Sequence, residues 1–301
     1  MSRPPDVPAS TRIASVSLDV GDLARSVGFY TDVIGLSAVA AGEGTASLGV
    51  DGAPLITLTE VRGAPPAPVG ATGLYHLAIL TTSRVELGRS LARLVERGYP
   101  LGGASDHLVS EALYLSDPDG NGIEIYRDRA RADWAMVGGN PKIDTLPLDL
   151  RALLDDARKA TRPWDGLAAG TTLGHVHLQV DDLAAARAFY VDLLGFDVTM
   201  DLSRMGALFV SAGGYHHHIG LNTWHSRGGS PRPEGTAGLV SFEVDLGDRD
   251  ALAAVEARLE AAGVHVDGGD GYISVEDPAG TTVVLSSGPT PIRSETQGET
   301  T

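Results

Sequence analysis

The chain has 301 residues, of which 43% are hydrophobic and 21% charged, a composition typical of a globular protein with room for two domains. It contains no cysteine, which excludes disulfide bonds and thiolate metal sites, so any bound metal must be held by His, Asp or Glu. The net charge of −16 argues against nucleic-acid binding, and the lack of both a long apolar run and a secretion signal predicts a cytoplasmic protein without a membrane span.

The first predicted elements have the order βαβββ. An alternating strand at residues 14–20 precedes an amphipathic helix at 22–34, and three short strands then run to about Glu60. Asp22 at the start of the helix and Gly35 just past its end are residue types that cap helices.

A second unit of the same order follows. Its first strand is predicted at residues 74–80 and its helix at 84–97, which Gly98 ends. The turn sequence DPDGNG separates the last two of its three remaining strands. These strands are predicted near residues 99–102, 111–116 and 122–126.

The second half of the chain repeats the first at an offset of 160 residues. Residues 13–36 align with 173–196, and Pro118 aligns far downstream with Pro278. An offset shared over such a length indicates a duplication. Third and fourth units are placed at residues 173–224 and 238–286, so the sequence predicts an α+β fold of four βαβββ modules in two tandem domains.

The predicted boundaries follow from this repeat. Between the domains we expect a linker that carries an acidic helix near residues 148–160. Polar and proline-containing ends are expected to be disordered. The full set is a disordered N-terminus at 1–12, an N-terminal domain at 13–128, the linker at 129–170, a C-terminal domain at 171–287 and a disordered tail at 288–301.

Several histidines and one glutamate fall on predicted strands. His76 and Glu124 are each enclosed by apolar neighbours, where an unpaired charge is costly, so for Glu124 we expect a cation partner, either a metal or an arginine. His175 and His177 alternate with apolar residues and therefore share one face of a strand. Residues 216–218 are three consecutive histidines, and the sequence leaves open which of them faces a site.

The repeat provides an internal control for these polar residues. Ser15 stands at the position of His175, Ser241 at that of His76, and Val284 at that of Glu124. The polar set is therefore confined to the second and third units. We predict one site per chain, built jointly by these two units.

The motifs FYTDVIGL, LYLSDPDGNGIEIY and GLYHLAIL, within the βαβββ repeat, resemble the vicinal oxygen chelate superfamily, which includes glyoxalase I and the extradiol dioxygenases. The longer segments at residues 105–129 and 208–224 are similar to bacterial catechol-2,3-dioxygenases. The resemblance spans about residues 13–285. It implies modules that form curved mixed sheets or open barrels.

The resemblance also implies roles for individual residues. By position in the motifs, the metal ligands would be His76, Glu124 and His175, with His177 left open as an alternative to His175. His217 would be the acid–base residue, although the choice among the three adjacent histidines stays open. Tyr114 and His107 would contact the substrate or dioxygen.

The activity implied is Fe(II)-dependent extradiol cleavage of a catechol-like ring by O2, with Mn(II) as the alternative metal and a monomer or homodimer as the assembly. Other metal-dependent reactions of the superfamily are alternatives, namely hydroquinone dioxygenase and glyoxalase- or lyase-type chemistry. Against the glyoxalase reaction, Gly220 stands where glyoxalase I places a second Glu. A metal-free small-molecule-binding protein is the non-enzymatic alternative, but its aromatic-lined pocket fits poorly with only 5% aromatic residues.

Overall fold

The computed structural model describes residues 7–288. The predicted disorder of residues 1–6 and of the tail from 289 onward lies outside these residues. The remainder of the predicted disordered N-terminus is instead packed, because Val7 is buried and donates its backbone N–H to the carbonyl of Gly195. The apolar side chain of Val7 packs in the core. The polar and proline-containing sequence around it did not indicate this packing.

The four βαβββ units are present in the predicted order. The first half contains β1 (Arg12–Val20), α1 (Leu23–Gly28), β2 (Ser37–Gly42), β3 (Thr45–Val50) and β4 (Ala53–Glu60), then β5 (Gly73–Leu80), α2 (Arg84–Arg97), β6 (Gly103–Asp106), β7 (Ser110–Ser116) and β8 (Gly122–Asp128). The second half contains β12 (Thr172–Gln179), α4 (Leu183–Arg187), β13 (Asp197–Leu202), β14 (Ala207–Ser211) and β15 (Ile219–Asn222), then β16 (Gly238–Asp245), α5 (Arg249–Ala261), β17 (Asp267–Gly269), β18 (Tyr272–Glu276) and β19 (Thr282–Ser286).

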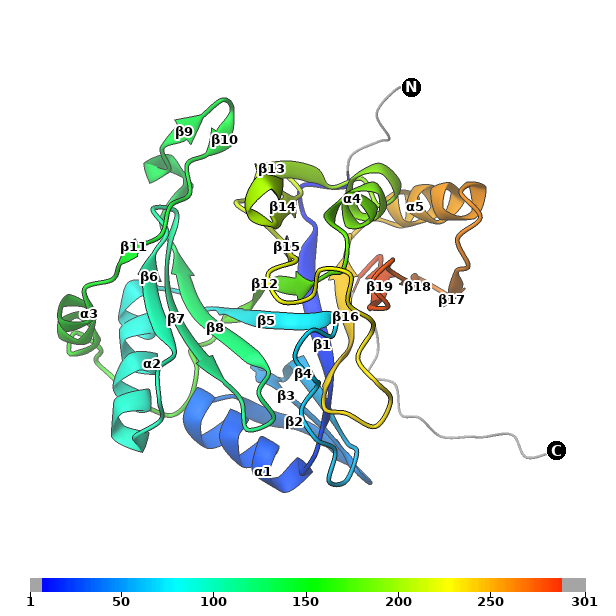
Figure 1. The fold of residues 1–301 in the computed structure, drawn as a ribbon. Coiled ribbons are helices and arrows are strands. Elements are labelled where there is room, and N and C mark those ends of the chain that lie inside the picture. The colour runs from blue at the N-terminus through cyan, green and yellow to red at the C-terminus, as the bar shows by residue number, and fades with distance from the viewer. Residues whose placement is uncertain (1–6, 289–301) are drawn as a thin grey trace.

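The strands form two large mixed sheets, each of which combines one unit from each half. The first and fourth units make an eight-stranded sheet, β17-β18-β19-β16-β1-β4-β3-β2. The second and third units make a nine-stranded sheet, β11-β6-β7-β8-β5-β12-β15-β14-β13, with β11 (Leu146–Pro147) added by the linker. Antiparallel pairs β1/β16 and β5/β12 join the halves, and β5 lies at the centre of Figure 1. The α+β prediction of four modules in tandem is confirmed, and both sheets remain open.

The duplicated helix differs from its prediction in one respect. The helix expected at 22–34 divides into α1 and a π-helical segment, Phe29–Ile34, and the third unit divides in the same way. The wider π turn lets the adjacent Phe29 and Tyr30 both enter the core. Tyr30 donates to Asp117 at 3.0 Å, and its repeat equivalent Tyr190 donates to Asp277 at 2.8 Å.

The linker is a structured part of the molecule. It contains the short helix Arg131–Asp133, a hairpin of β9 (Met136–Val137) and β10 (Asn140–Pro141), then β11 and α3 (Leu150–Ala157). Helix α3 is shorter at both ends than the predicted 148–160, since Asp149 caps its start. The strand expected near 99–102 is β6, a few residues later, because Tyr99 instead follows the end of α2 and hydrogen-bonds to Leu94.

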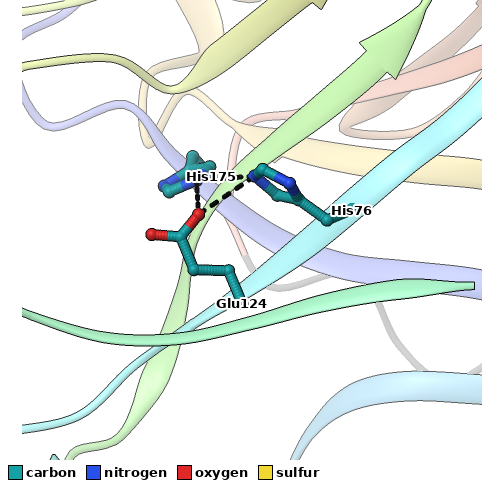
Figure 2. Close-up of side chains that lie close together, drawn as sticks. All are labelled: His76, Glu124 and His175. Atoms are coloured by element: carbon teal, nitrogen blue, oxygen red, sulfur yellow. Dashed lines mark hydrogen bonds and ion pairs between the residues drawn. The ribbon is translucent and has the colours of Figure 1, made fainter. Parts of the chain in front are cut away.

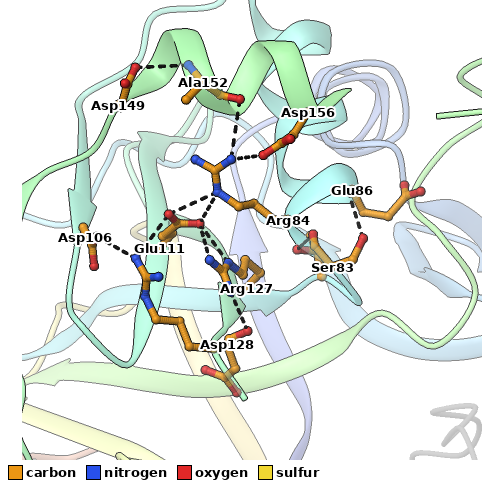
Figure 3. Close-up of polar contacts among 12 residues, drawn as sticks. Ser83, Arg84, Glu86, Asp106, Glu111, Arg127, Asp128, Asp149, Ala152 and Asp156 are labelled. Carbon is orange, nitrogen blue, oxygen red and sulfur yellow. Dashed lines mark hydrogen bonds and ion pairs between the residues drawn. The ribbon is translucent and has the colours of Figure 1, made fainter. Parts of the chain in front are cut away.

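An ionic network fixes this linker to the second unit (Figure 3). Glu111 on β7 is only 4% exposed and accepts from Arg84 at 2.8 Å and from Arg127 at 2.7 Å. Arg84 also pairs with Asp156 on α3. Because Arg84 contacts both the buried Glu111 on β7 and Asp156 on α3, the network holds α3 against α2 and β7.

No helix among residues 7–288 is both long and apolar enough to cross a membrane.

Candidate metal centre

The register of three adjacent strands brings His76, Glu124 and His175 together. Ala78 on β5 lies opposite Glu124 on β8 and also opposite His175 on β12. His76 precedes Ala78 by two residues and therefore points to the same face of the sheet. Three side chains that are far apart in sequence thus converge over Ala78, whose small methyl group leaves space between them.

The three side chains meet through one carboxylate oxygen (Figure 2). Glu124 Oε2 lies 3.1 Å from His76 Nε2 and 3.1 Å from His175 Nε2. The two Nε2 atoms are 3.3 Å apart. All three residues are buried, with His76 at 7%, Glu124 at 3% and His175 at 1% exposure.

The protonation states suit metal binding. Burial lowers the pKa of His175 to about 4, despite the opposing effect of Glu124, so this imidazole is neutral near pH 7. Burial would raise the pKa of Glu124, but its contacts with His175 and His76 outweigh that and lower the pKa well below its usual range. A neutral imidazole and an ionised carboxylate are the ligand forms that a metal requires.

The donor set fits a divalent metal. Ligand atoms about 3 Å apart match neighbouring corners of an octahedron whose metal–ligand bonds are about 2.1 Å. Two histidines and one carboxylate on one face are the arrangement of non-haem Fe(II) oxygenases, and they leave other positions open. The geometry therefore provides a coherent metal site.

His177 lies beside the triad without joining it. It stands opposite His76 in the β5/β12 pair, and the two ring centroids are 5.0 Å apart. Its ring also packs against Tyr75 and Trp224. Its Nε2 is buried and has no hydrogen-bond partner. Of the two candidate ligands on β12, the geometry thus favours His175.

The three consecutive histidines lie in the connection before β15, not within a strand, so strand alternation does not describe them. His217 points toward the triad, with its ring centroid 4.1 Å from that of His175. His216 turns toward Asp128, at 3.0 Å, and His218 accepts from the backbone N–H of Ala212, at 3.1 Å. Partial burial and then the neighbouring histidines lower the pKa of His217 well below its usual value. A neutral His217 is therefore available beside the triad.

Tyr114 and His107 extend the site along β7 and the turn before it. Tyr114 lies directly opposite Glu124 in the β7/β8 pair, and its ring centroid is 5.8 Å from that of His76. Burial, reinforced by Glu124, raises the pKa of Tyr114 above its usual value, so the phenol stays protonated. His107 Nε2 lies 2.7 Å from the Tyr114 hydroxyl, and its Nδ1 lies 2.8 Å from the carbonyl of Asp144 in the linker.

Two residues near the site were missed in the sequence. Asp128 ends β8 and contacts His216, while Tyr215 donates to Asp128 at 2.7 Å. A signal for Asp128 was available, because residues 124, 126 and 128 share one face of a strand. No comparable signal existed for Tyr215, which lies in an irregular loop.

Two glycines shape the surroundings of the triad. A Cβ atom on Gly174 would lie 1.6 Å from the hydroxyl oxygen of Tyr126, so the absence of a side chain lets this tyrosine fit beside β12. A Cβ atom on Gly220 would lie 2.9 Å from the ring of His177. Gly220 stands at the position where glyoxalase I has its second glutamate. A carboxylate side chain has no room at this position, because the ring of His177 occupies the space.

The equivalent place in the eight-stranded sheet has different chemistry. By register, Ser15, Ser241 and Val284 occupy the positions of His175, His76 and Glu124, as the sequence repeat indicated. Among residues 7–288, the three-ligand group of His76, Glu124 and His175 has no counterpart there. A cavity of about 240 Å³ lies beside this sheet and is lined in part by Asp19 and Arg232. None of the three triad residues lines it.

The chain is similar to known proteins over most of its length. A catechol-2,3-dioxygenase of Bacillus subtilis is 44% identical over 276 residues, which cover 89% of this chain and 94% of that protein. Among solved structures, a putative dioxygenase from Bacillus subtilis superposes with a TM-score of 0.62 at 14% identity, over 91% of this chain and 84% of its own. Glyoxalase I from Zea mays superposes with a TM-score of 0.56 at 19% identity, over 92% of each chain. These two structures support the fold alone.

The family assignment rests on both halves of the chain. Residues 12–125 and residues 172–285 each match the same family. The resemblance inferred from the motifs is thereby confirmed. The chain belongs to the Glyoxalase/Bleomycin resistance protein/Dioxygenase superfamily.

Proposed function

We propose that this protein is an Fe(II)-dependent extradiol dioxygenase that cleaves a catechol-like aromatic diol with dioxygen. The observation that carries the proposal is the convergence of His76, Glu124 and His175, whose ligand atoms all lie within 4.8 Å of one another. The 44% identity to a catechol-2,3-dioxygenase supports the same reaction class. Bound at these residues, the metal would supply the open positions at which diol and dioxygen react.

The surrounding residues supply binding and proton transfer. His217 is neutral and lies against His175, so it is placed to take a proton from a diol hydroxyl and to return it later in turnover. Tyr114 remains a phenol, and its hydroxyl oxygen can accept a hydrogen bond from a substrate hydroxyl over the triad. His107 holds that phenol from the other side, at 2.7 Å.

The rival activities fit the site less well. Glyoxalase chemistry would need the second carboxylate for which Gly220 leaves no room. A metal-free binding protein would gain nothing from a buried glutamate between two buried histidines. Manganese is the alternative metal, because the same donor set suits Mn(II), and turnover after reconstitution with each metal distinguishes the two.

The test is anaerobic reconstitution with Fe(II), followed by aerated catechol, with the yellow ring-fission product and oxygen uptake as readouts. Manganese is reconstituted in parallel. We expect product from the native chain and none from Glu124→Ala, which should also lose the bound metal. Glu96→Gln, at a carboxylate whose side chain is 66% exposed, is the control and should retain both. A tightly bound metal without ring cleavage of catechols or hydroquinones would contradict the proposal.

A further inference from the structure

A chain of hydrogen bonds leads from Asp128 through His216 to His217. His216 Nε2 lies 3.0 Å from Asp128 Oδ1, and His216 Nδ1 lies 2.9 Å from His217 Nδ1. Both ring nitrogens of His216 are therefore engaged, one by a carboxylate and the other by a second imidazole. Because His216 is only 1% exposed, water does not compete for either nitrogen.

The chemistry of the groups sets the direction of these hydrogen bonds. A carboxylate only accepts, so His216 Nε2 must carry the proton that faces Asp128. We take His216 as the neutral imidazole, which has a single N–H, so that its Nδ1 accepts from His217 Nδ1. His217 is consequently protonated on Nδ1, and its Nε2 is left with a free lone pair.

We propose that Asp128 and His216 are positioning residues that fix the tautomer of His217 and so present its Nε2 as the proton acceptor for a substrate hydroxyl. In that step the O–H bond of the diol breaks and an N–H bond forms at Nε2. The positive charge on His217 is stabilised by its Nδ1–H bond to His216 and, beyond that, by the Asp128 carboxylate. The proton returns to the product, which restores the neutral ring. This assignment rests on the proposed function.

Other contacts hold the chain of hydrogen bonds in place. The Tyr215 hydroxyl donates to Asp128 Oδ2 at 2.7 Å, so each carboxylate oxygen has its own donor. Tyr126 donates in turn to Tyr215, at 2.7 Å. The ring of Tyr215 packs on His216 with centroids 4.1 Å apart, and Trp134 from the linker packs against His216 at 5.7 Å.

The linker also secures the loop that carries the histidines. Arg131 donates to the carbonyl of Gly213 at 2.9 Å and to that of Gly214. Loop and strand β8 are thus tied together from two sides. If Asp128 only anchored the loop, its replacement by an isosteric amide would leave the proton on His217 where it was.

The decisive variant is therefore Asp128→Asn. Its amide can donate to His216 Nε2 while its oxygen keeps the bond from Tyr215, and this would move the proton to His216 Nδ1 and the His217 proton to Nε2. The equivalent substitution in a Ser–His–Asp triad lowers kcat about 10⁴-fold through the wrong histidine tautomer. We expect kcat here to fall at least about 100-fold, with KM changed less than about threefold and metal content unchanged.

The tautomer is measured directly. Long-range ¹⁵N–¹H NMR of the full-length, ¹⁵N-histidine-labelled chain, both without metal and loaded with diamagnetic zinc, should show His217 protonated on Nδ1 in the native protein and on Nε2 in Asp128→Asn. A His217→Gln sample assigns the signals. Tyr215→Phe is the matched control, since it keeps the ring on His216 and the Asp128–His216 bond. It should keep the native tautomer and lose less than about fivefold in kcat.

The outcomes separate this proposal from the proposed function. An Nε2–H tautomer of His217 in the native protein overturns the relay whether or not ring cleavage occurs, as does Asp128→Asn with an unchanged tautomer. The native spectrum alone decides the first point, even if a variant does not fold. A native Nδ1–H tautomer without ring cleavage would contradict the dioxygenase assignment and support the placement of the proton.

Discussion

The two sheets of this protein have the same architecture but different side chains at their central positions. In the nine-stranded sheet the central position is Ala78, and the proposed ligands His76, Glu124 and His175 surround it. In the eight-stranded sheet the register puts Glu243 at the central position. A carboxylate at the centre takes the space that a metal needs, whereas an alanine leaves it open.

The residues around Glu243 match its position. It accepts from Ser15 at 3.0 Å and from Ser286 at 2.8 Å, and Ser15 stands where the other sheet has His175. Short hydroxyl side chains thus hydrogen-bond to both oxygens of this half-buried carboxylate. A duplicated fold therefore provides two equivalent positions, and the side-chain choice at a few of them determines which one can hold a cation.

The loops that connect equivalent strands also differ between the two sheets. Strands β3 and β4 are joined by the tight turn of Asp51 and Gly52, whereas residues 212–218 join β14 and β15 and carry the three histidines. The longer connection brings His217 over the triad. The longer connection in one copy of the repeat thus places histidines beside only one of the two described sheets.

The largest effect among variants that keep the triad is expected for His217→Ala. It should leave metal content unchanged and lower kcat about 10²- to 10⁴-fold, because a positioned acid–base group is lost. Steady-state oxygen uptake and metal analysis measure the two quantities. His265→Ala, at a side chain that is 86% exposed, is the control and should behave as the native protein. Unchanged turnover in His217→Ala would remove this residue from the mechanism.

Enlarging the central alanine tests whether open space explains the difference between the sheets. Ala78→Val adds two methyl groups between Glu124 and His175, at a position that is fully buried. We expect metal affinity to fall at least about tenfold, since ligand positions must shift. Competitive titration with a chelator measures the affinity. Val240→Ala, at an exposed position on β16, should have native affinity, and equal affinities of both variants would refute the idea.

Gly174 offers a smaller test, because the eight-stranded sheet has Ala14 at the equivalent position. Gly174→Ala places a methyl group where the Tyr126 hydroxyl lies, so this tyrosine must move. The free energy of unfolding should fall by about 1–3 kcal/mol, as is usual for overpacking. Urea unfolding of Gly174→Ala and of Gly174→Ala combined with Tyr126→Phe measures it. The second variant should recover part of the loss, and no recovery would mean that the hydroxyl is not the obstacle.

The smallest expected effect is that of His218 on stability at acid pH. In the register of the eight-stranded sheet, the equivalent position is occupied by the apolar Leu55. Burial lowers the pKa of His218 to about 3, well below its unfolded value of about 6.5. The unfolded chain thus binds the extra proton between these values, so stability is lost as pH falls from about 6.5 toward 3, at up to about 1.4 kcal/mol per pH unit.

His218→Leu should reduce this acid sensitivity in the metal-free protein. Urea unfolding at pH 7 and pH 5 measures it as the difference between the two free energies. At pH 7 the variant should be less stable by about 1 kcal/mol, because the Ala212 N–H loses its acceptor. A pH dependence identical to that of the native chain would show that His218 does not take up the proton.

The sequence by itself determined the βαβββ units and the duplication, and it singled out the residues of the candidate site. Periodicity and caps defined α2 at Arg84–Arg97, and the repeat showed that only the second and third units carry ligand residues. These features are local, or compare one segment with another, so a single sequence reveals them. The motifs also pointed to the superfamily that the family match then confirmed.

The sequence predicted that the second and third units would build one site, but only the tertiary structure decided the strand register between them and where each histidine points. Strand pairing between β5 and β12 depends on contacts across 99 residues between His76 and His175, which no local pattern encodes. The loop at residues 212–218 has no regular period, so the directions of His216, His217 and His218 follow from Asp128, the triad and Ala212 respectively. Short-range patterns specify the elements, but burial and hydrogen bonding across the sheet determine which side chains meet.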